Sequence, residues 1–73
     1  MIESGDVLIT TNGDFMIIRV EIASNNEFYG WAAMYMDSEE EYPYEIQYMN
    51  EELEKLIQEI KKEGNIVEIK KKK

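Results

Sequence analysis

The chain has 73 residues and a formal net charge of −8, and it contains neither cysteine nor histidine. These values exclude a disulfide framework and metal sites built on thiolate or imidazole ligands, and they argue against nucleic-acid binding through a basic face. No stretch approaches the ~20 apolar residues of a membrane span, and the N-terminus lacks the basic-then-apolar order of a signal peptide. We therefore expect a soluble, cytoplasmic protein with no membrane partner.

The first third of the chain has the pattern of a β-hairpin. Residues 7–11 and 15–23 are rich in β-branched and apolar side chains and flank the dipeptide Asn12-Gly13, which favours a two-residue hairpin loop. With that loop, Ile9 lies opposite Met16.

A second turn at residues 24–27 predicts a third strand over residues 28–36, with Trp31 opposite Val20. Because side chains alternate along a strand, this register predicts two faces of the sheet. One face would carry Val7, Ile9, Met16, Ile18, Val20, Ile22, Tyr29, Trp31, Ala33 and Tyr35. The other would carry Phe15, Ile17, Phe28, Ala32, Met34 and Met36.

The second half of the chain predicts an edge strand and a helix. Pro43 cannot donate a ladder hydrogen bond, so residues 44–48 are expected to form a short edge strand. Asn50 is a favourable N-cap for a helix over residues 51–63. An apolar stripe at helical spacing should pack this helix on the Val20 and Trp31 face; it consists of Leu53, Leu56, Ile57 and Ile60.

Residues 65–70 are expected to form a last strand, and residues 70–73 a frayed basic tail. Together the elements predict a single α+β domain over residues 1–73. Its antiparallel sheet would have four or five strands in the order β-β-β-(β)-α-β, with one helix packed on one face. A small SH3-like barrel is the alternative, because tight hairpins suit that fold.

The charge is unevenly distributed along the chain. Residues 1–54 carry 13 acidic side chains and one basic one, whereas residues 55–73 carry seven lysines and three glutamates. The densest acidic run spans residues 37–54 and contains no base; its acids are Asp37, Glu39, Glu40, Glu41, Glu45, Glu51, Glu52 and Glu54. Such a surface should attract basic partners. The alternative is that the charge only keeps a small protein soluble.

The same composition leaves little chemistry for an enzyme. The commonest general base and the best nucleophile are missing, and a chain this short can scarcely build a substrate cleft around paired carboxylates. Counted from Asp37, a calcium loop of the EF-hand type would need glycine at position 6 and glutamate at position 12, but tyrosines stand there. We expect no enzymatic activity, no metal and no cofactor, which leaves binding.

Tyr42, Tyr44 and Tyr48 alternate with the acids of the 37–54 run, and Glu52, Glu59 and Glu63 follow on one flank of the predicted helix. In size, charge and tyrosine content the chain resembles the small acidic proteins with which phages disable DNA-handling proteins of their hosts. Those inhibitors imitate DNA and occupy the DNA site of a glycosylase, a nucleoid protein, a restriction enzyme or a sliding clamp. The resemblance implies a basic DNA-binding protein of the bacterial host as partner, with a sliding clamp or a histone-like nucleoid protein favoured, and no direct contact with nucleic acid.

The expected partner-binding residues are acids and tyrosines of the 37–54 run and of the helix. They are Asp37, Glu39, Glu40, Glu41, Tyr42, Tyr44, Glu45, Glu51, Glu52, Glu54, Glu59 and Glu63. The competing hypothesis is a small interaction module that binds a peptide through Trp31 and the tyrosines. Trp31 stands among alternating apolar residues, which favours a place in the core instead.

A homodimer is also expected. One helix covers only one face of the sheet, and pairing two copies about a two-fold axis is the commonest way to bury the other. The expected interface residues are Phe15, Ile17, Phe28, Met34 and Met36. The alternative is that the strand at residues 44–48 curls over this face and closes a barrel.

Overall fold

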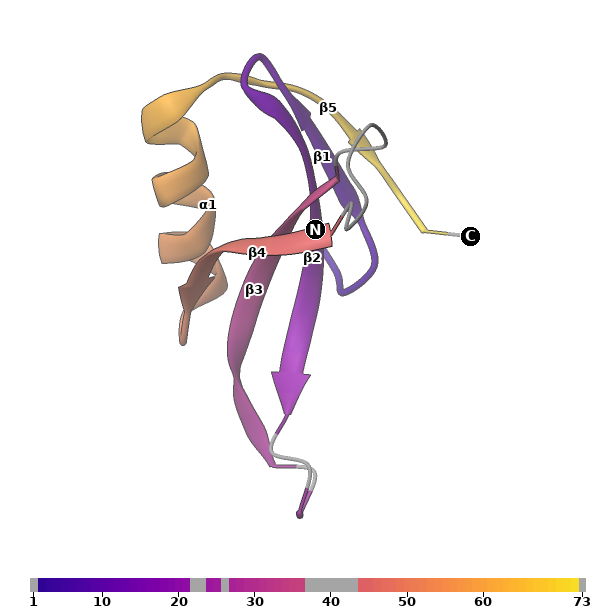
Figure 1. Cartoon of the computed structure of the whole chain (residues 1–73), viewed down its shortest axis with the longest axis vertical. Coiled ribbons are helices and arrows are strands. Elements are labelled where there is room, and N and C mark those ends of the chain that lie inside the picture. The colour runs from indigo at the N-terminus through magenta and orange to yellow at the C-terminus, as the bar shows by residue number, and fades with distance from the viewer. Residues whose placement is uncertain (1, 22–23, 26, 37–43, 73) are drawn as a thin grey trace.

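In the computed structural model, residues 2–21, 24–25, 27–36 and 44–72 are described. These residues form five strands and one helix: β1 (Val7–Thr10), β2 (Gly13–Glu21), β3 (Phe28–Met36), β4 (Tyr44–Asn50), α1 (Leu53–Glu63) and β5 (Ile66–Lys70). The strands make one antiparallel sheet in the order β4-β3-β2-β1-β5, and α1 packs on one side of it (Figure 1). The predicted α+β fold is confirmed. Because β4 and β5 lie at opposite edges of an open sheet, the alternative of a closed SH3-like barrel is wrong.

The first hairpin forms two residues away from the predicted register. Thr10 pairs with Gly13, so the loop is Thr11-Asn12. The Thr10 hydroxyl donates to the carbonyl oxygen of Gly13 at 2.7 Å and accepts from the Asn12 amide at 3.0 Å. Gly13 has φ 119, and a Cβ there would collide with the Tyr35 ring, so glycine is required. A shift of two residues leaves every side chain of β1 and β2 on its predicted face.

The register of the second hairpin differs from the prediction by one residue, so each side chain of β3 lies on the opposite face of the sheet from the one predicted. Ile17 pairs with Ala33 and Arg19 with Trp31, and the register shifts between Val20 and Glu21. The strands end at Glu21 and Phe28, so the connection is six residues long instead of two. Both faces of β3 are apolar, so the hydrophobic pattern alone fits either register.

We call the side of the sheet that α1 covers the helix face and the opposite side the far face. The residues on each face differ from the prediction. The helix face carries Leu8, Phe15, Ile17, Trp31, Ala33, Tyr35 and Tyr48. The far face carries Val7, Ile9, Met16, Ile18, Val20, Ala32, Met34, Met36, Ile46 and Met49. The helix packs with Trp31 as expected, but not with Val20.

The core lies between the helix face and α1. Leu56 and Ile60 of α1 are buried against Leu8, Phe15 and Ile17. Leu53, Ile57 and Ile66 are partly buried around them. The apolar stripe of the helix is thus confirmed.

Three of the expected dimer residues are corrected by this arrangement. Phe15 and Ile17 are 4% and 0% exposed beneath α1, so they are not available to a second copy. Phe28 is exposed, but it sits at the end of the sheet, against Trp31 and the Arg19 guanidinium. Met34 and Met36 do lie on the face that α1 leaves uncovered.

The helix begins two residues later than predicted. Asn50 still belongs to β4, where it pairs with Trp31, and the N-cap position falls on Glu52, which makes no side-chain capping bond. The Asn50 side-chain oxygen instead accepts from the Glu52 amide at 2.9 Å. Asn50 thus stabilises the turn that leads into α1.

Most of the basic tail is docked against the body of the domain, contrary to the expected frayed terminus. The Asp6 carboxylate is fully buried. It accepts hydrogen bonds from the Lys71 ammonium group and from the backbone amides of Glu3, at 2.8 Å, and Lys72, at 3.0 Å. These bonds lower the pKa of Asp6 from 3.8 to about 2. Asp6 therefore joins the N-terminal turn to residues 71 and 72; Lys73 lies outside the described residues.

Candidate functional site

The predicted acidic site is described only in part. Asp37, Glu39, Glu40, Glu41 and Tyr42 lie outside the described residues. Tyr44 begins β4, directly after that segment. The remaining acids of the site lie on β4, on α1 and in the turn between these two elements, all of which belong to the described residues.

β4 is an edge strand, and it brings Glu45 next to the helix side of the sheet. Glu45 pairs with Tyr35, a residue of the helix face. The register shifts at Gln47, which is exposed along with Glu45 and Ile46. This edge of the sheet thus presents side chains to solvent directly after the acidic run.

Glu59 and Glu63 of α1 lie on the flank of the helix that faces β4. The Tyr48 hydroxyl donates to Glu63 Oε2 at 2.7 Å. That bond, together with burial and the charges of Glu63 and Glu59, raises the pKa of Tyr48. Tyr48 therefore joins the edge strand to the acidic flank, and it also packs edge-on against Phe15 in the core.

Glu52 starts the same flank of α1 but is partly neutralised. Its carboxylate lies 2.8 Å from the Lys55 ammonium nitrogen, and this pairing raises the pKa of Lys55. Both side chains are well exposed, so the pair contributes little to stability. Its effect is to reduce the negative charge at this end of the flank.

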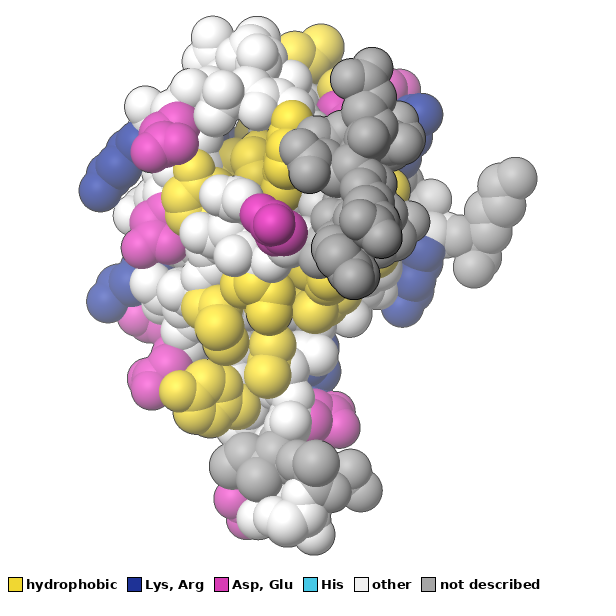
Figure 2. All heavy atoms as spheres, viewed as in Figure 1, with side chains coloured by type: hydrophobic (Ala, Val, Ile, Leu, Met, Phe, Trp, Pro, Cys, Tyr) yellow, Lys and Arg dark blue, Asp and Glu magenta, His cyan; other side chains and the backbone are white. Residues whose placement is uncertain are grey.

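The predicted site residues therefore separate into two groups. The first group consists of Glu45 on β4, Glu52 at the N-cap of α1, and Glu59 and Glu63 on the side of α1 that faces β4, and we call these four residues the acidic flank. Glu54 lines a larger groove together with Arg19 and Trp31, and Glu51 lines a small hollow with Tyr29 and Met49. Figure 2 shows acidic and basic side chains alternating along the side of the molecule that carries α1, with an apolar patch beside them.

The described residues contain no group of three acidic side chains arranged to hold a metal ion. In the same part of the chain, α1 is far too short and polar to cross a bilayer.

The sequence does not predict two features of the structure. Asp6 meets Lys71 and Lys72 across 65 and 66 residues of chain, and no local pattern signals such a contact. The second feature is a groove that is lined by Trp31, by Ile2 from the N-terminal segment and by Ile57 of α1. The one sequence signal was the single tryptophan, which the alternating apolar pattern assigned to the core.

Comparison with known proteins finds no family model that matches the chain, no similar protein among the curated ones and no similar solved structure.

Proposed function

We propose that this protein is an acidic binding protein that occupies the DNA-binding surface of a basic host protein and so inhibits it. The observation that carries the proposal is the acidic flank, where Glu59 and Glu63 lie beside Tyr48 at an open sheet edge and Glu45 belongs to the same edge strand. In the chain this edge directly follows the acids of residues 37–41. A row of carboxylates on a strand, a turn and a helix can offer basic side chains a field like that of a duplex, which carries one charge per ~1.7 Å.

A bacterial sliding clamp or a histone-like nucleoid protein is the favoured target, because both surround DNA with positive surfaces. The place of action would then be the bacterial cytoplasm. Tyrosines next to the acids would add apolar contact area at little cost in side-chain entropy. No catalytic step and no cofactor enter this proposal.

The test is binding to a purified sliding clamp and to a purified histone-like nucleoid protein, with and without competing duplex DNA. We expect duplex DNA to displace the protein. Association should slow as salt rises, because the Debye length falls from ~10 Å at 0.1 M to ~3 Å at 1 M.

Replacing Glu45, Glu59 and Glu63 together by glutamine should slow association by roughly tenfold at low salt, because electrostatic steering is lost. The matched control is Glu68→Gln on β5, at the opposite edge of the sheet, which should change little. The measurement is the association rate by surface plasmon resonance. Equal rates for the triple variant and the control, or binding that duplex DNA does not reduce, would contradict the proposal.

We also propose that the protein is a homodimer whose copies meet through the far face. The far face is apolar from Met16 to Val20 of β2 and along β3, and on β4 Ile46 and Met49 are 54% and 45% exposed. Its charged residues Asp14, Glu68 and Lys70 pair with Ile9 and Val7 at the β1 side. Two copies with a net charge of −8 each repel one another least where they meet through this apolar part of the face. Sedimentation at micromolar concentration should give twice the 8.6 kDa of one chain.

Ile46→Lys should shift this dimer to the monomer, because it places a charge within the apolar face. Gln47→Lys is the matched control, since Gln47 is its exposed neighbour at the register shift. A wild-type protein that sediments as a monomer, or an Ile46→Lys variant that remains a dimer, would refute pairing through this face.

A further inference from the structure

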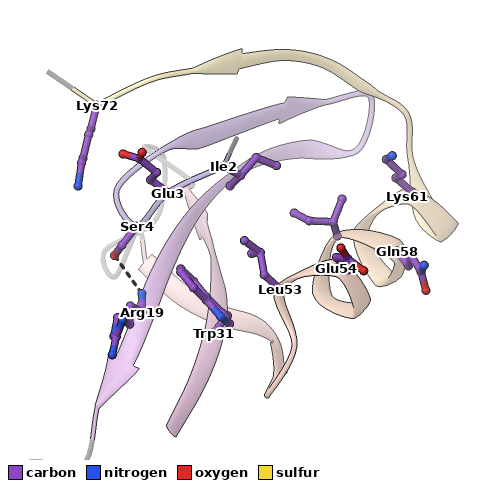
Figure 3. A pocket seen from close by; sticks show the side chains of 11 residues that line it. Ile2, Glu3, Ser4, Arg19, Trp31, Leu53, Glu54, Gln58, Lys61 and Lys72 are labelled. Atoms are coloured by element: carbon purple, nitrogen blue, oxygen red, sulfur yellow. Dashed lines mark hydrogen bonds between the residues drawn. The ribbon is translucent and has the colours of Figure 1, made fainter. Parts of the chain in front are cut away.

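A groove of about 890 Å³ opens between residues 2–4, strands β2 and β3 and helix α1 (Figure 3). Its size falls within the ~300–1,000 Å³ of typical ligand sites. Trp31 of β3 lines the groove together with Ile2 of the N-terminal segment and Leu53 and Ile57 of the helix. In Figure 3, Trp31 lies between Arg19 and Leu53. These apolar side chains are only half-buried, so the groove presents apolar surface to solvent.

The wall formed by residues 2–4 is fixed to the sheet. The Arg19 amide donates to the Ser4 hydroxyl at 3.0 Å, and the Gly5 amide donates to the Ile17 carbonyl at 2.6 Å. Gly5 has φ 98, a backbone conformation that favours glycine. The groove is therefore held open between two anchored walls.

Arg19 is positioned at one end of the groove by its neighbours. Its guanidinium lies 4.7 Å from the centre of the Phe28 ring, and its Nε lies 3.2 Å from a Glu21 carboxylate oxygen. Phe28 in turn packs edge-on against Trp31, with ring centres 5.9 Å apart. Arginine and tryptophan side chains held in this way are typical centres of binding energy in protein interfaces.

The groove has a larger share of basic side chains than the molecule as a whole, although Glu21 offsets part of this charge through its ion pair with Arg19. Three of the eight basic side chains of the chain line it, Arg19, Lys61 and Lys72, against two acids, Glu3 and Glu54. An anionic group beside an apolar anchor matches both the rim and the floor.

We propose that this groove binds a short peptide segment of a partner protein that presents an aromatic or aliphatic anchor next to carboxylates. The anchor would lie on Trp31 between Leu53 and Ile57, and a carboxylate would pair with Arg19 or Lys61. Arginine suits this role because its planar fork matches a carboxylate. The site is separate from the acidic flank and does not depend on binding to a basic protein.

Trp31 is the single tryptophan of the chain, so its fluorescence reports on the groove directly. The probe is a blocked eight-residue peptide with Leu-Phe at its centre followed by Asp-Asp. Its matched control carries Lys-Lys in place of Asp-Asp. We expect a saturable shift of Trp31 emission with the acidic peptide, and at least tenfold weaker binding of the basic one.

Arg19→Gln and Lys61→Gln should each weaken the acidic peptide severalfold. Lys62→Gln is the matched control, because Lys62 is the next residue on α1 and does not line the groove. All three side chains are exposed, so the fold should be retained, which circular dichroism checks. No saturable shift up to millimolar peptide, equal affinity for the two peptides, or equal loss in Lys61→Gln and Lys62→Gln would overturn the proposal.

Discussion

Replacing Leu56 by alanine is expected to destabilise the protein by about 2–5 kcal/mol, as truncation of a fully buried leucine usually does. Leu56 is 0% exposed and joins α1 to Leu8, Phe15 and Ile17. A chain of this size has a total stability of only ~0.05–0.15 kcal/mol per residue. One cavity at this position can therefore unfold a large share of the molecules, which thermal and urea unfolding measure.

The matched comparison is between Ile17→Ala and Ile18→Ala. The two residues are neighbours of the same type, but Ile17 is fully buried beneath the helix and Ile18 is half-buried on the far face. We expect Ile17→Ala to cost as much as Leu56→Ala, and Ile18→Ala clearly less. Similar losses at both positions would mean that the helix does not cover the face that carries Ile17.

The helix and the first hairpin could be predicted because local signals define them. Four apolar residues at helical spacing, ending at Ile60, set the buried side of α1. The Asn12-Gly13 turn located the first hairpin, and its error of two residues moved no side chain to another face.

The face of the sheet that α1 covers could not be predicted, because β3 is apolar on both sides. Trp31 and Ala33 alternate with Ala32 and Met34, so neither register is penalised by the pattern. The choice is made by the length of the β2–β3 connection and by the irregularity at Val20. Neither has a strong sequence signal, so Phe15 and Ile17 were assigned to the wrong surface.

The candidate site was predicted as a set of residue types, whereas its arrangement depends on tertiary structure. The helix pattern placed Glu59 and Glu63 on one flank, but the Tyr48 hydrogen bond that joins this flank to β4 depends on where the edge strand packs. Likewise, the sequence pattern of the lysines near the C-terminus predicts a solvated tail, whereas in the structure Lys71 forms a hydrogen bond with Asp6. Long-range polar contacts of this kind leave no periodic pattern in the chain.

Asp6→Asn is expected to release residues 71 and 72 and to loosen β5. The native carboxylate accepts from three donors, the Lys71 ammonium and the amides of Glu3 and Lys72. An asparagine keeps one acceptor oxygen and turns an NH₂ group toward the remaining donors. We expect faster hydrogen exchange of the β5 amides, measured by NMR at neutral pH, with little change in α1. The control Asp14→Asn alters a carboxylate in β2 and should leave β5 unchanged.

The same residue predicts how stability depends on pH. Because folding lowers the pKa of Asp6 from 3.8 to about 2, its contribution is fully present above pH ~4 and is lost as the pH falls through ~2. The other carboxylates also titrate in acid, so the informative quantity is the difference in unfolding free energy between the wild type and Asp6→Asn at pH 7, 4 and 2. This difference should be largest at pH 7, persist at pH 4 and shrink towards pH 2. Protonation at low pH removes the negative charge of Asp6 from the wild type, and the Asp6→Asn variant has no charge at this position at any pH. A difference that stays constant down to pH 2 would mean that the Asp6 carboxylate does not hold the C-terminal residues through its charge.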